Sequence, residues 1–159
     1  MMTENTLSTA EITAIQEIYR HFPEKSAACI EGLKIIQQHR RWVSDEAVRG
    51  LAEILDMSPA AIDSVATYYS LIFRRPVGRN VILICNSVSC WIMGYDQIAA
   101  CVKKQLAIGF GETTADDRYT LLTIPCLGTC DHAPAMIINE DLHRDLTADN
   151  IDSILKQYQ

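Results

Sequence analysis

The chain has 159 residues, of which 48% are hydrophobic and 21% charged, so it can form one ordinary domain or two small ones. Its net charge is −6, which argues against nucleic-acid binding because phosphate neutralisation needs clustered Lys and Arg. No apolar run approaches the ~20 residues needed to cross a bilayer, and the N-terminus lacks the basic and apolar regions of a signal peptide. These features predict a soluble cytosolic protein that does not itself insert into a membrane.

The first half of the chain has the hydrophobic periodicity of short helices. Ser8 and Glu11 have the spacing of a capping box, which predicts a helix that Pro23 ends. A second helix is expected from about residue 26 to residue 39. The apolar positions expected to be buried on these two helices are Ile12, Ile15, Ile18, Tyr19 and Phe22, then Ala27, Ile30, Leu33 and Ile36.

Two further helices have clear starting residues. Ser44 precedes the acidic residues Asp45 and Glu46, which suit the N-terminal end of a helix dipole. Ser58 is an N-cap, and Pro59 takes the first helical position. The expected buried stripes are Val48, Leu51, Ile54 and Leu55 on one helix, and Ile62, Val65, Tyr69, Ile72 and Phe73 on the other. Four short helices predict a small bundle.

The segment from residue 74 to residue 80, Arg-Arg-Pro-Val-Gly-Arg-Asn, interrupts this periodicity and is typical of an inter-domain linker. We therefore expect a helical domain at residues 1–75 and a second domain at residues 80–159. The second half reads as a strand at 81–85, a helix at 95–106, strands at 119–124, 135–138 and 142–144, and a helix capped by Thr147. A helix between two strands implies a right-handed parallel crossover, and residues 136–144 are expected to form a hairpin. The predicted fold class is α+β, with a helical bundle followed by a thioredoxin-like α/β domain.

Four of the six cysteines form two closely spaced pairs, each just after a predicted strand. Cys85 and Cys90 follow the strand at 81–85, and Cys126 and Cys130 follow the strand at 119–124. Two strands that each end in a loop cysteine can bring four thiolates to one edge of a sheet. Four thiolates repel one another unless a cation neutralises them, and structural disulfides are improbable in the cytosol. The pattern therefore predicts a metal ion or an iron–sulfur cluster.

The spacing of the pairs favours a cluster. Zinc sites usually present cysteines two residues apart, whereas here four and three residues separate the members of each pair. A [2Fe–2S] cluster is larger and takes two thiolates on each iron, which suits these wider loops. The four histidines (His21, His39, His132 and His143) are scattered, so a Rieske-type centre is disfavoured. A zinc-stabilised interaction module remains the alternative from a different class.

Roles without a metal fit the cysteine pattern less well. Four ordinary buried thiols would not require two pairs in loops rich in Gly, Ser and Thr, and a thiol–disulfide catalyst would need a C-x-x-C motif that the chain lacks. Cys29 and Cys101 lie in predicted helices without cysteine neighbours and are interpreted as packing residues. Trp91 could shield the site or belong to a core or interface. Asp131 and His132 are not expected to be ligands.

The two cysteine motifs, Cys85-Asn-Ser-Val-Ser-Cys90-Trp-Ile-Met-Gly94 and Cys126-Leu-Gly-Thr-Cys130-Asp-His-Ala-Pro134, closely resemble those of one family. This family is the E (24 kDa-type) subunit of NADH–quinone oxidoreductase, respiratory complex I. The segments 65–70 and 76–79 also resemble the family's sequences. The resemblance extends from about residue 10 to the end of the chain.

The resemblance implies a thioredoxin-like domain that carries one [2Fe–2S] cluster, with Cys85, Cys90, Cys126 and Cys130 as ligands. It also implies electron exchange with a partner subunit that binds NADH and carries FMN. No nucleotide-binding motif occurs in this chain, which fits an accessory role. A neighbouring iron–sulfur subunit is the other expected partner. The expected location is cytoplasmic, peripheral to the inner membrane through the complex. Equivalent subunits of NAD-linked hydrogenases and formate dehydrogenases are the alternative within this class.

Overall fold

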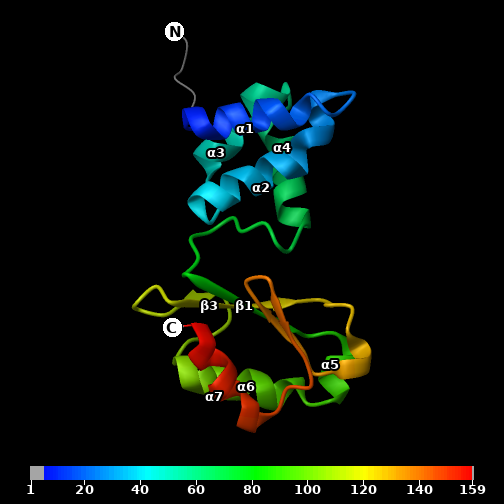
Figure 1. The fold of residues 1–159 in the computed structure, drawn as a ribbon, viewed down its shortest axis with the longest axis vertical. Coiled ribbons are helices and arrows are strands. Elements are labelled where there is room, and N and C mark those ends of the chain that lie inside the picture. The colour runs from blue at the N-terminus through cyan, green and yellow to red at the C-terminus, as the bar shows by residue number, and fades with distance from the viewer. Residues whose placement is uncertain (1–5, 159) are drawn as a thin grey trace. The chain divides into compact units, whose positions relative to one another are not determined.

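A computed structural model describes residues 6–158 of the chain. The chain divides into two compact units with a boundary between Pro76 and Val77, which Figure 1 shows in blue to green and in green to red. The first unit is helical, and the second contains a sheet with helices. None of the helices among the described residues is both long and apolar enough to cross a membrane.

The helical unit contains α1 (Thr9–Tyr19), a 3-10 turn η1 (Lys25–Ala28), α2 (Cys29–Arg40), α3 (Asp45–Leu55) and α4 (Pro59–Tyr68). The predicted helix starts are confirmed, because the Ser8, Ser44 and Ser58 side chains each accept a hydrogen bond from a backbone N–H in the first turn. The capping box of α1 is complete, since the Ser8 N–H donates to the Glu11 carboxylate. These hydrogen bonds satisfy N–H groups that the helices themselves leave without partners.

The core of the helical unit matches most of the predicted stripes but not their ends. Phe22 is 36% exposed because α1 ends at Tyr19 and tightens into a turn in which Phe22 N–H donates to Tyr19 O. Ala27 is exposed, because the first turn of the predicted second helix is the 3-10 turn η1, which directs Ala28 and Cys29 into the core. Tyr69 is 47% exposed because α4 ends at Tyr68.

One ion pair in this unit is buried. The Glu11 side chain on α1 is 1% exposed, and Arg40 on α2 donates to its two carboxylate oxygens at 2.5 and 2.6 Å. The same guanidinium also donates to Thr6 O at 3.0 Å. Because removal of charge from water is costly, a buried carboxylate persists only with such a complete set of partners. The pair thus joins the two ends of the segment that contains α1 and α2.

The second unit is built on a five-stranded sheet whose order among the described residues is β2-β3-β1-β4-β5. Its strands are β1 (Asn80–Cys85), β2 (Glu112–Thr113), β3 (Tyr119–Ile124), β4 (Met136–Ile138) and β5 (Asp141–His143), and its helices are α5 (Val88–Ile92), α6 (Tyr95–Leu106) and α7 (Ala148–Leu155). β1 and β3 are parallel, with α6 between them in sequence, which confirms the predicted crossover. The hairpin of β4 and β5 is confirmed as well.

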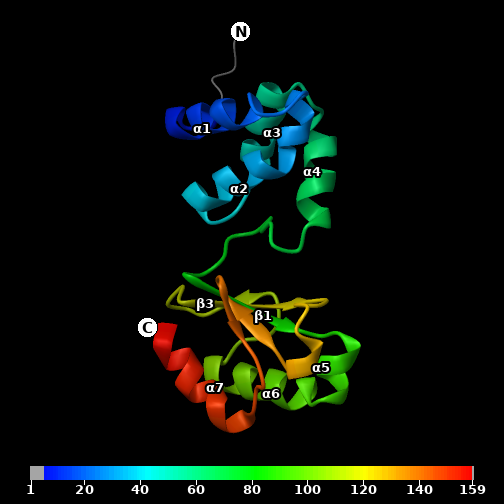
Figure 2. The same cartoon turned by 45° about the vertical axis from the view of Figure 1, so that its right-hand side comes forward.

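Both α6 and α7 lie over the same face of the sheet in Figures 1 and 2. Beneath them lies an apolar core that includes Ile82, Ile84, Leu121, Met136 and Ile138 from the strands and Ile98, Val102, Ile151 and Ile154 from the helices. The alternation of these strand residues places one side of each strand against the helices. The core therefore fixes β1 and β3, whose carboxyl ends lead into the two cysteine loops.

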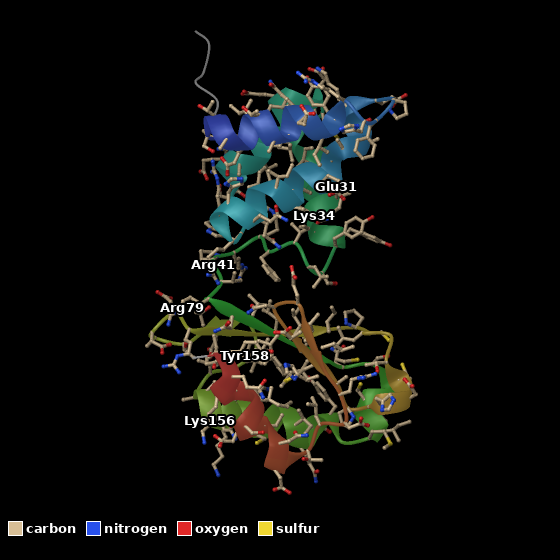
Figure 3. The ribbon with its side chains drawn as sticks, viewed as in Figure 1. Glu31, Lys34, Arg41, Arg79, Lys156 and Tyr158 are labelled. Atoms are coloured by element: carbon tan, nitrogen blue, oxygen red, sulfur yellow. The ribbon has the colours of Figure 1, made fainter. Side chains whose placement is uncertain are left out.

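Tyr158, the last residue that the structure describes, links the C-terminal segment to the sheet (Figure 3). Its hydroxyl donates to Asp141 at 2.9 Å and lies 2.7 Å from His143 Nε2, so it contacts both ends of β5. Its carbonyl accepts a hydrogen bond from Tyr119 Oη on β3 at 3.1 Å. Burial, followed by the hydrogen bond to Asp141, raises the pKa of Tyr158 to about 12, so this hydroxyl remains a donor at neutral pH.

Candidate metal centre

The parallel pairing of β1 and β3 places two of the cysteines at the same edge of the sheet. Cys85 is the last residue of β1 and lies opposite Ile124, the last residue of β3, while Cys126 follows two residues later. The Asn86 N–H donates to Ile124 O at 3.0 Å, which keeps the two strand ends together beyond the ladder. The sheet thus delivers the first cysteine of each pair to one place.

The second cysteine of each pair lies on a short turn. Cys90 is on α5 and is 2% exposed, and Cys130 is the first residue of the 3-10 turn η2 (Cys130–His132). In both Figures 1 and 2 this yellow-orange turn lies beside the green α5. The two loops therefore converge, as the sequence predicted, and neither α5 nor η2 was expected from hydrophobic periodicity.

The four thiol groups interact with one another. The Sγ atoms of Cys126 and Cys130 are 3.8 Å apart. Burial, then the neighbouring Cys85 thiol, raises the pKa of Cys90 to about 11, and the charge of Cys130 contributes in the same direction. The Gly128 N–H, then the thiols of Cys130 and Cys85, lower the pKa of Cys126. Cys90 and Cys126 each thus lie near a thiol of the other pair.

The donor set suits an iron–sulfur cluster. Tetrahedral coordination with metal–sulfur bonds of about 2.3 Å separates two ligand sulfurs by about 3.8 Å, which is the separation of Cys126 and Cys130. The Gly128 N–H donates to Cys126 Sγ at 3.3 Å, as expected for a thiolate that must keep its negative charge. Gly128 has a φ of +77°, a left-handed conformation that glycine adopts without strain and that this loop requires.

The exposure of the four cysteines is asymmetric. Cys85 and Cys90 are buried, whereas Cys126 and Cys130 are exposed. A centre held by all four would therefore have one side against the protein interior and one side near the surface, which suits electron exchange with a partner. Within residues 6–158, no three His, Cys, Asp or Glu side chains are placed to hold a single metal ion.

The two remaining cysteines lie elsewhere. Cys29 belongs to the core of the helical unit, where burial raises its pKa. Cys101 is half-buried on α6, and its Sγ lies 3.8 Å from Ala148 O and 3.6 Å from Gln105 Nε2. These contacts agree with packing roles and place neither thiol with the two pairs.

Three features around the site were not predicted from the sequence. Trp91 is 61% exposed, so it is not a core residue. His132 Nδ1 lies 2.9 Å from an oxygen of Asp145, a residue 13 positions later in the chain. The hydrophobic pattern cannot reveal such a polar contact between loops. Ala133 and Pro134, which follow η2, are joined by a cis peptide bond.

The comparisons with known proteins agree with this geometry. The sequence model of the thioredoxin-like [2Fe-2S] ferredoxin family matches residues 15–159. The E subunits of NADH-quinone oxidoreductase from Buchnera aphidicola subsp. Acyrthosiphon pisum and from Escherichia coli strain K12 are each 47% identical, over 96% of this chain and 94% and 92% of their own. The corresponding protein of Pseudomonas aeruginosa is 44% identical over 96% of this chain and 92% of its own.

Solved structures of an NAD+-reducing [NiFe]-hydrogenase, in its air-oxidized and H2-reduced states, resemble the fold. Both have a TM-score of 0.70 and 26% sequence identity over 83% of this chain. The chain spans about a quarter of the length of the matched hydrogenase chain, 23% and 22% in the two structures. The likeness therefore concerns one part of a much longer protein.

Proposed function

The chain belongs to the thioredoxin-like [2Fe-2S] ferredoxin family and, within it, to the E subunits of NADH-quinone oxidoreductase; on this premise we propose that it is the electron-transferring [2Fe–2S] subunit of an NADH:quinone oxidoreductase. One [2Fe–2S] cluster is the cofactor of this family. We propose Cys85, Cys90, Cys126 and Cys130 as its four ligands. The observation that carries this assignment is the convergence of two cysteine pairs at the parallel ends of β1 and β3.

When bound, the cluster accepts and releases single electrons. The chain's own residues hold and insulate it. The paired ends of β1 and β3 fix Cys85 and the start of the second loop, so the backbone at these two points is in place before iron binds. The Gly128 N–H stabilises the negative charge of the Cys126 thiolate. The burial of Cys85 and Cys90 excludes water from one side of the four-cysteine site. Surroundings less polar than water favour the state of the site that carries the smaller net charge.

The partner in this proposal is the subunit that oxidises NADH and carries FMN, together with a neighbouring iron–sulfur subunit. The relatives are named as subunits of one oxidoreductase, which supports an assembly with several chains. We place the protein in the cytoplasmic arm of that complex, peripheral to the inner membrane. An electron received from the flavin would stay on this chain until it returns to the main electron-transfer path that leads to quinone.

Two alternatives differ in their consequences. An equivalent subunit of an NAD-linked hydrogenase would have the same cluster, and the hydrogenase fold likeness supports it, but the 47% identity to E subunits of NADH-quinone oxidoreductase exceeds the 26% identity to the hydrogenase chain. A zinc-stabilised interaction module would have no redox activity. Metal identity separates this module from the proposed electron carrier. The carrier has thiolate pairs on two irons, whereas the module has its thiolates on one zinc ion.

The experiment is visible absorption and EPR spectroscopy on anaerobically purified protein, before and after reduction with dithionite, with iron and sulfide analysis on the same sample. The proposal predicts two irons and two sulfides per chain and an EPR signal that appears only on reduction. Zinc in place of iron, even after anaerobic reconstitution with iron and sulfide, would identify a structural module instead. Reduction of the cluster by NADH only when the flavin-bearing subunit is added would then test the assigned partner.

A further inference from the structure

The outer face of α5 is apolar and exposed although it borders the cysteine site. Val88, Trp91 and Ile92 are spaced i, i+3 and i+4, so they share one side of the helix, and Met93 follows directly. Their exposed fractions are 65%, 61%, 69% and 60%. Cys90 lies on the opposite, buried side of the same helix. We call these four exposed residues the α5 patch.

The α5 patch is unusual for the surface of a folded chain. A helix normally turns such an apolar stripe toward its own core, and contiguous exposed apolar surface marks interaction sites. α5 is instead held by its inner side, where Cys90 packs and where the Trp91 N–H donates to Ser87 O at 2.9 Å. Most of the surface of these apolar side chains therefore lies outside the described core, where only another surface could bury it.

The segments that hold the cysteines carry charged side chains of one sign. The segments that hold the cysteines, residues 80–102 and 119–143, contain no Lys or Arg. Asp96 at the start of α6 and Asp131 beside Cys130 are both exposed. A complementary partner would thus present an apolar cavity with a basic rim. A second copy of this chain is a poor occupant, because it would bring two acidic rims together.

We propose that the α5 patch is the docking surface for the redox partner that exchanges electrons with the cluster, and that this partner offers an apolar pocket for Trp91 surrounded by Lys or Arg side chains. This inference rests on the proposed function, which requires a protein donor or acceptor. Electron transfer slows steeply with distance, so the partner must approach the site closely. The patch lies on the helix that supplies Cys90 and therefore directs the partner to the cluster.

The test is a binding titration between the full-length chain with its cluster and the purified FMN-binding subunit of the same complex. The variant is Trp91→Ser with Ile92→Ser, which removes the aromatic and the aliphatic centre of the patch. The matched control is Tyr68→Ser with Leu71→Ser, which removes an aromatic and an aliphatic residue that are 80% and 51% exposed on the helical unit. Because aromatic residues at the centre of an interface dominate affinity, we expect about 30-fold weaker binding for the patch variant and less than about twofold for the control.

A second variant tests the acidic rim. Asp96→Asn with Asp131→Asn should slow association and reduce its dependence on salt, because fewer opposite charges remain to steer the partner. Iron content and the EPR signal of every variant are measured first, and only samples with an intact cluster are titrated. Hence a lost cluster cannot be mistaken for lost docking.

Three outcomes would overturn the proposal. Equal affinity of the patch variant and the unmodified chain, both with intact clusters, would remove the docking role but leave the electron-carrier function standing. Self-association of the unmodified chain that the patch variant abolishes, with unchanged affinity for the flavin-bearing subunit, would assign the patch to a second copy. No binding or electron exchange by the unmodified chain would contradict the proposed function itself.

Discussion

His132 and Asp145 are joined twice, once through side chains and once through the backbone. His132 Nδ1 lies 2.9 Å from Asp145 Oδ2, and the Asp145 N–H donates to His132 O at 2.9 Å. His132 is the last residue of η2, which begins with Cys130, and Asp145 lies just before α7. The turn that carries one proposed ligand is therefore tied to the loop before the C-terminal helix.

We expect Asp145→Asn to weaken this tie and to speed cluster loss by up to about fivefold, since an exposed pair of this kind contributes at most about 1 kcal/mol. Asn tolerates the φ of +50° that Asp145 has, so the backbone bond should persist. The measurement is the rate at which visible absorption disappears with an iron chelator. Asp149→Asn on α7 is the control. An equal change in the rate of cluster loss there would mean that the loss of a negative charge, and not the loss of the contact with His132, causes the effect.

The ligand assignment predicts a sharp division among the six cysteines. Cys126→Ser and Cys130→Ser should each reduce bound iron to below about half, because hydroxyl oxygen is a poor ligand for a site that favours soft sulfur. Cys101→Ser and Cys29→Ala should leave iron content unchanged, since those thiols pack within helices. Iron and sulfide analysis after anaerobic reconstitution provides the measurement. A similar loss for Cys101→Ser would show that the four ligands are wrongly assigned.

The sequence predicted the elements whose signals are local. Ser44 and Ser58 begin helices because their hydroxyl groups accept N–H bonds within the same turn, and the strand at 119–124 was predicted with the bounds that it has. The convergence of the cysteine loops followed from the rule that two strands joined through a helix form a parallel crossover. This rule needs only the order of the elements along the chain. These features need no knowledge of distant residues.

The features that escaped prediction depend on distant contacts or on very short elements. β2 has only two residues, so the alternation of a strand cannot be detected in it. Glu11 was recognised as half of a capping box, but its partner Arg40 is 29 residues away. Trp91 could not be assigned to core or surface, because periodicity does not say whether an apolar stripe faces the same chain or another one.

The linker between the units is shorter than the sequence indicated. Arg74 is fastened to the helical unit by bonds to Val43 O, Asp45 and Asp63, while the N–H groups of Gly78 and Arg79 bond to Thr120 and Asp117 in the second unit. Only residues 75–77 lie between these attachments. We propose that residues 1–75 and 80–159 fold as separate domains joined through this segment.

That proposal predicts unequal responses to cluster removal. In the chain without iron, subtilisin should cleave residues 80–159 first, because their ligand loops lose a cross-link, while the helical domain stays resistant. Mass spectrometry of the fragments over time, with and without the cluster, gives the measurement. Cleavage that begins equally in both halves would mean that the two units unfold together.

Gly78 is predicted to tolerate no side chain. A Cβ atom placed there would lie 2.9 Å from Asp117 O and 3.0 Å from the carbonyl carbon of Tyr119, both of which are backbone atoms. Gly78→Ala should therefore displace the start of β3 and cost about 1–3 kcal/mol of the free energy of unfolding. Gly109→Ala is the matched control, since its Cβ would approach only the flexible Glu112 side chain, at 3.3 Å. Urea unfolding by circular dichroism should separate the two variants, and identical midpoints would refute the steric argument.

The buried pair of Glu11 and Arg40 makes the stability of the helical unit depend on pH. Burial of Glu11 acts to raise its pKa, but the hydrogen bonds from Arg40 and Ser8 and the charge of Arg40 outweigh it and lower the pKa from 4.5 to about 2. Because the folded state binds the proton less tightly than the unfolded state, the stabilisation is complete above pH 4.5. It decreases as the pH falls from 4.5 toward 2. At about 1.4 kcal/mol per pH unit, the full contribution is about 3 kcal/mol.

We therefore expect Glu11→Gln to lower the free energy of unfolding at pH 7 by about 3 kcal/mol, and the difference from the unmodified chain to shrink toward about pH 2. Urea unfolding can be followed through Trp42 fluorescence in a Trp91→Phe background, which leaves one tryptophan, located in the helical unit. Glu17→Gln is the control, because the Glu17 side chain is 66% exposed and its pair with Arg20 lies at the surface. A difference that stays constant between pH 7 and about pH 2 would show that the lost stability comes from packing of the Gln side chain and not from the charge of Glu11.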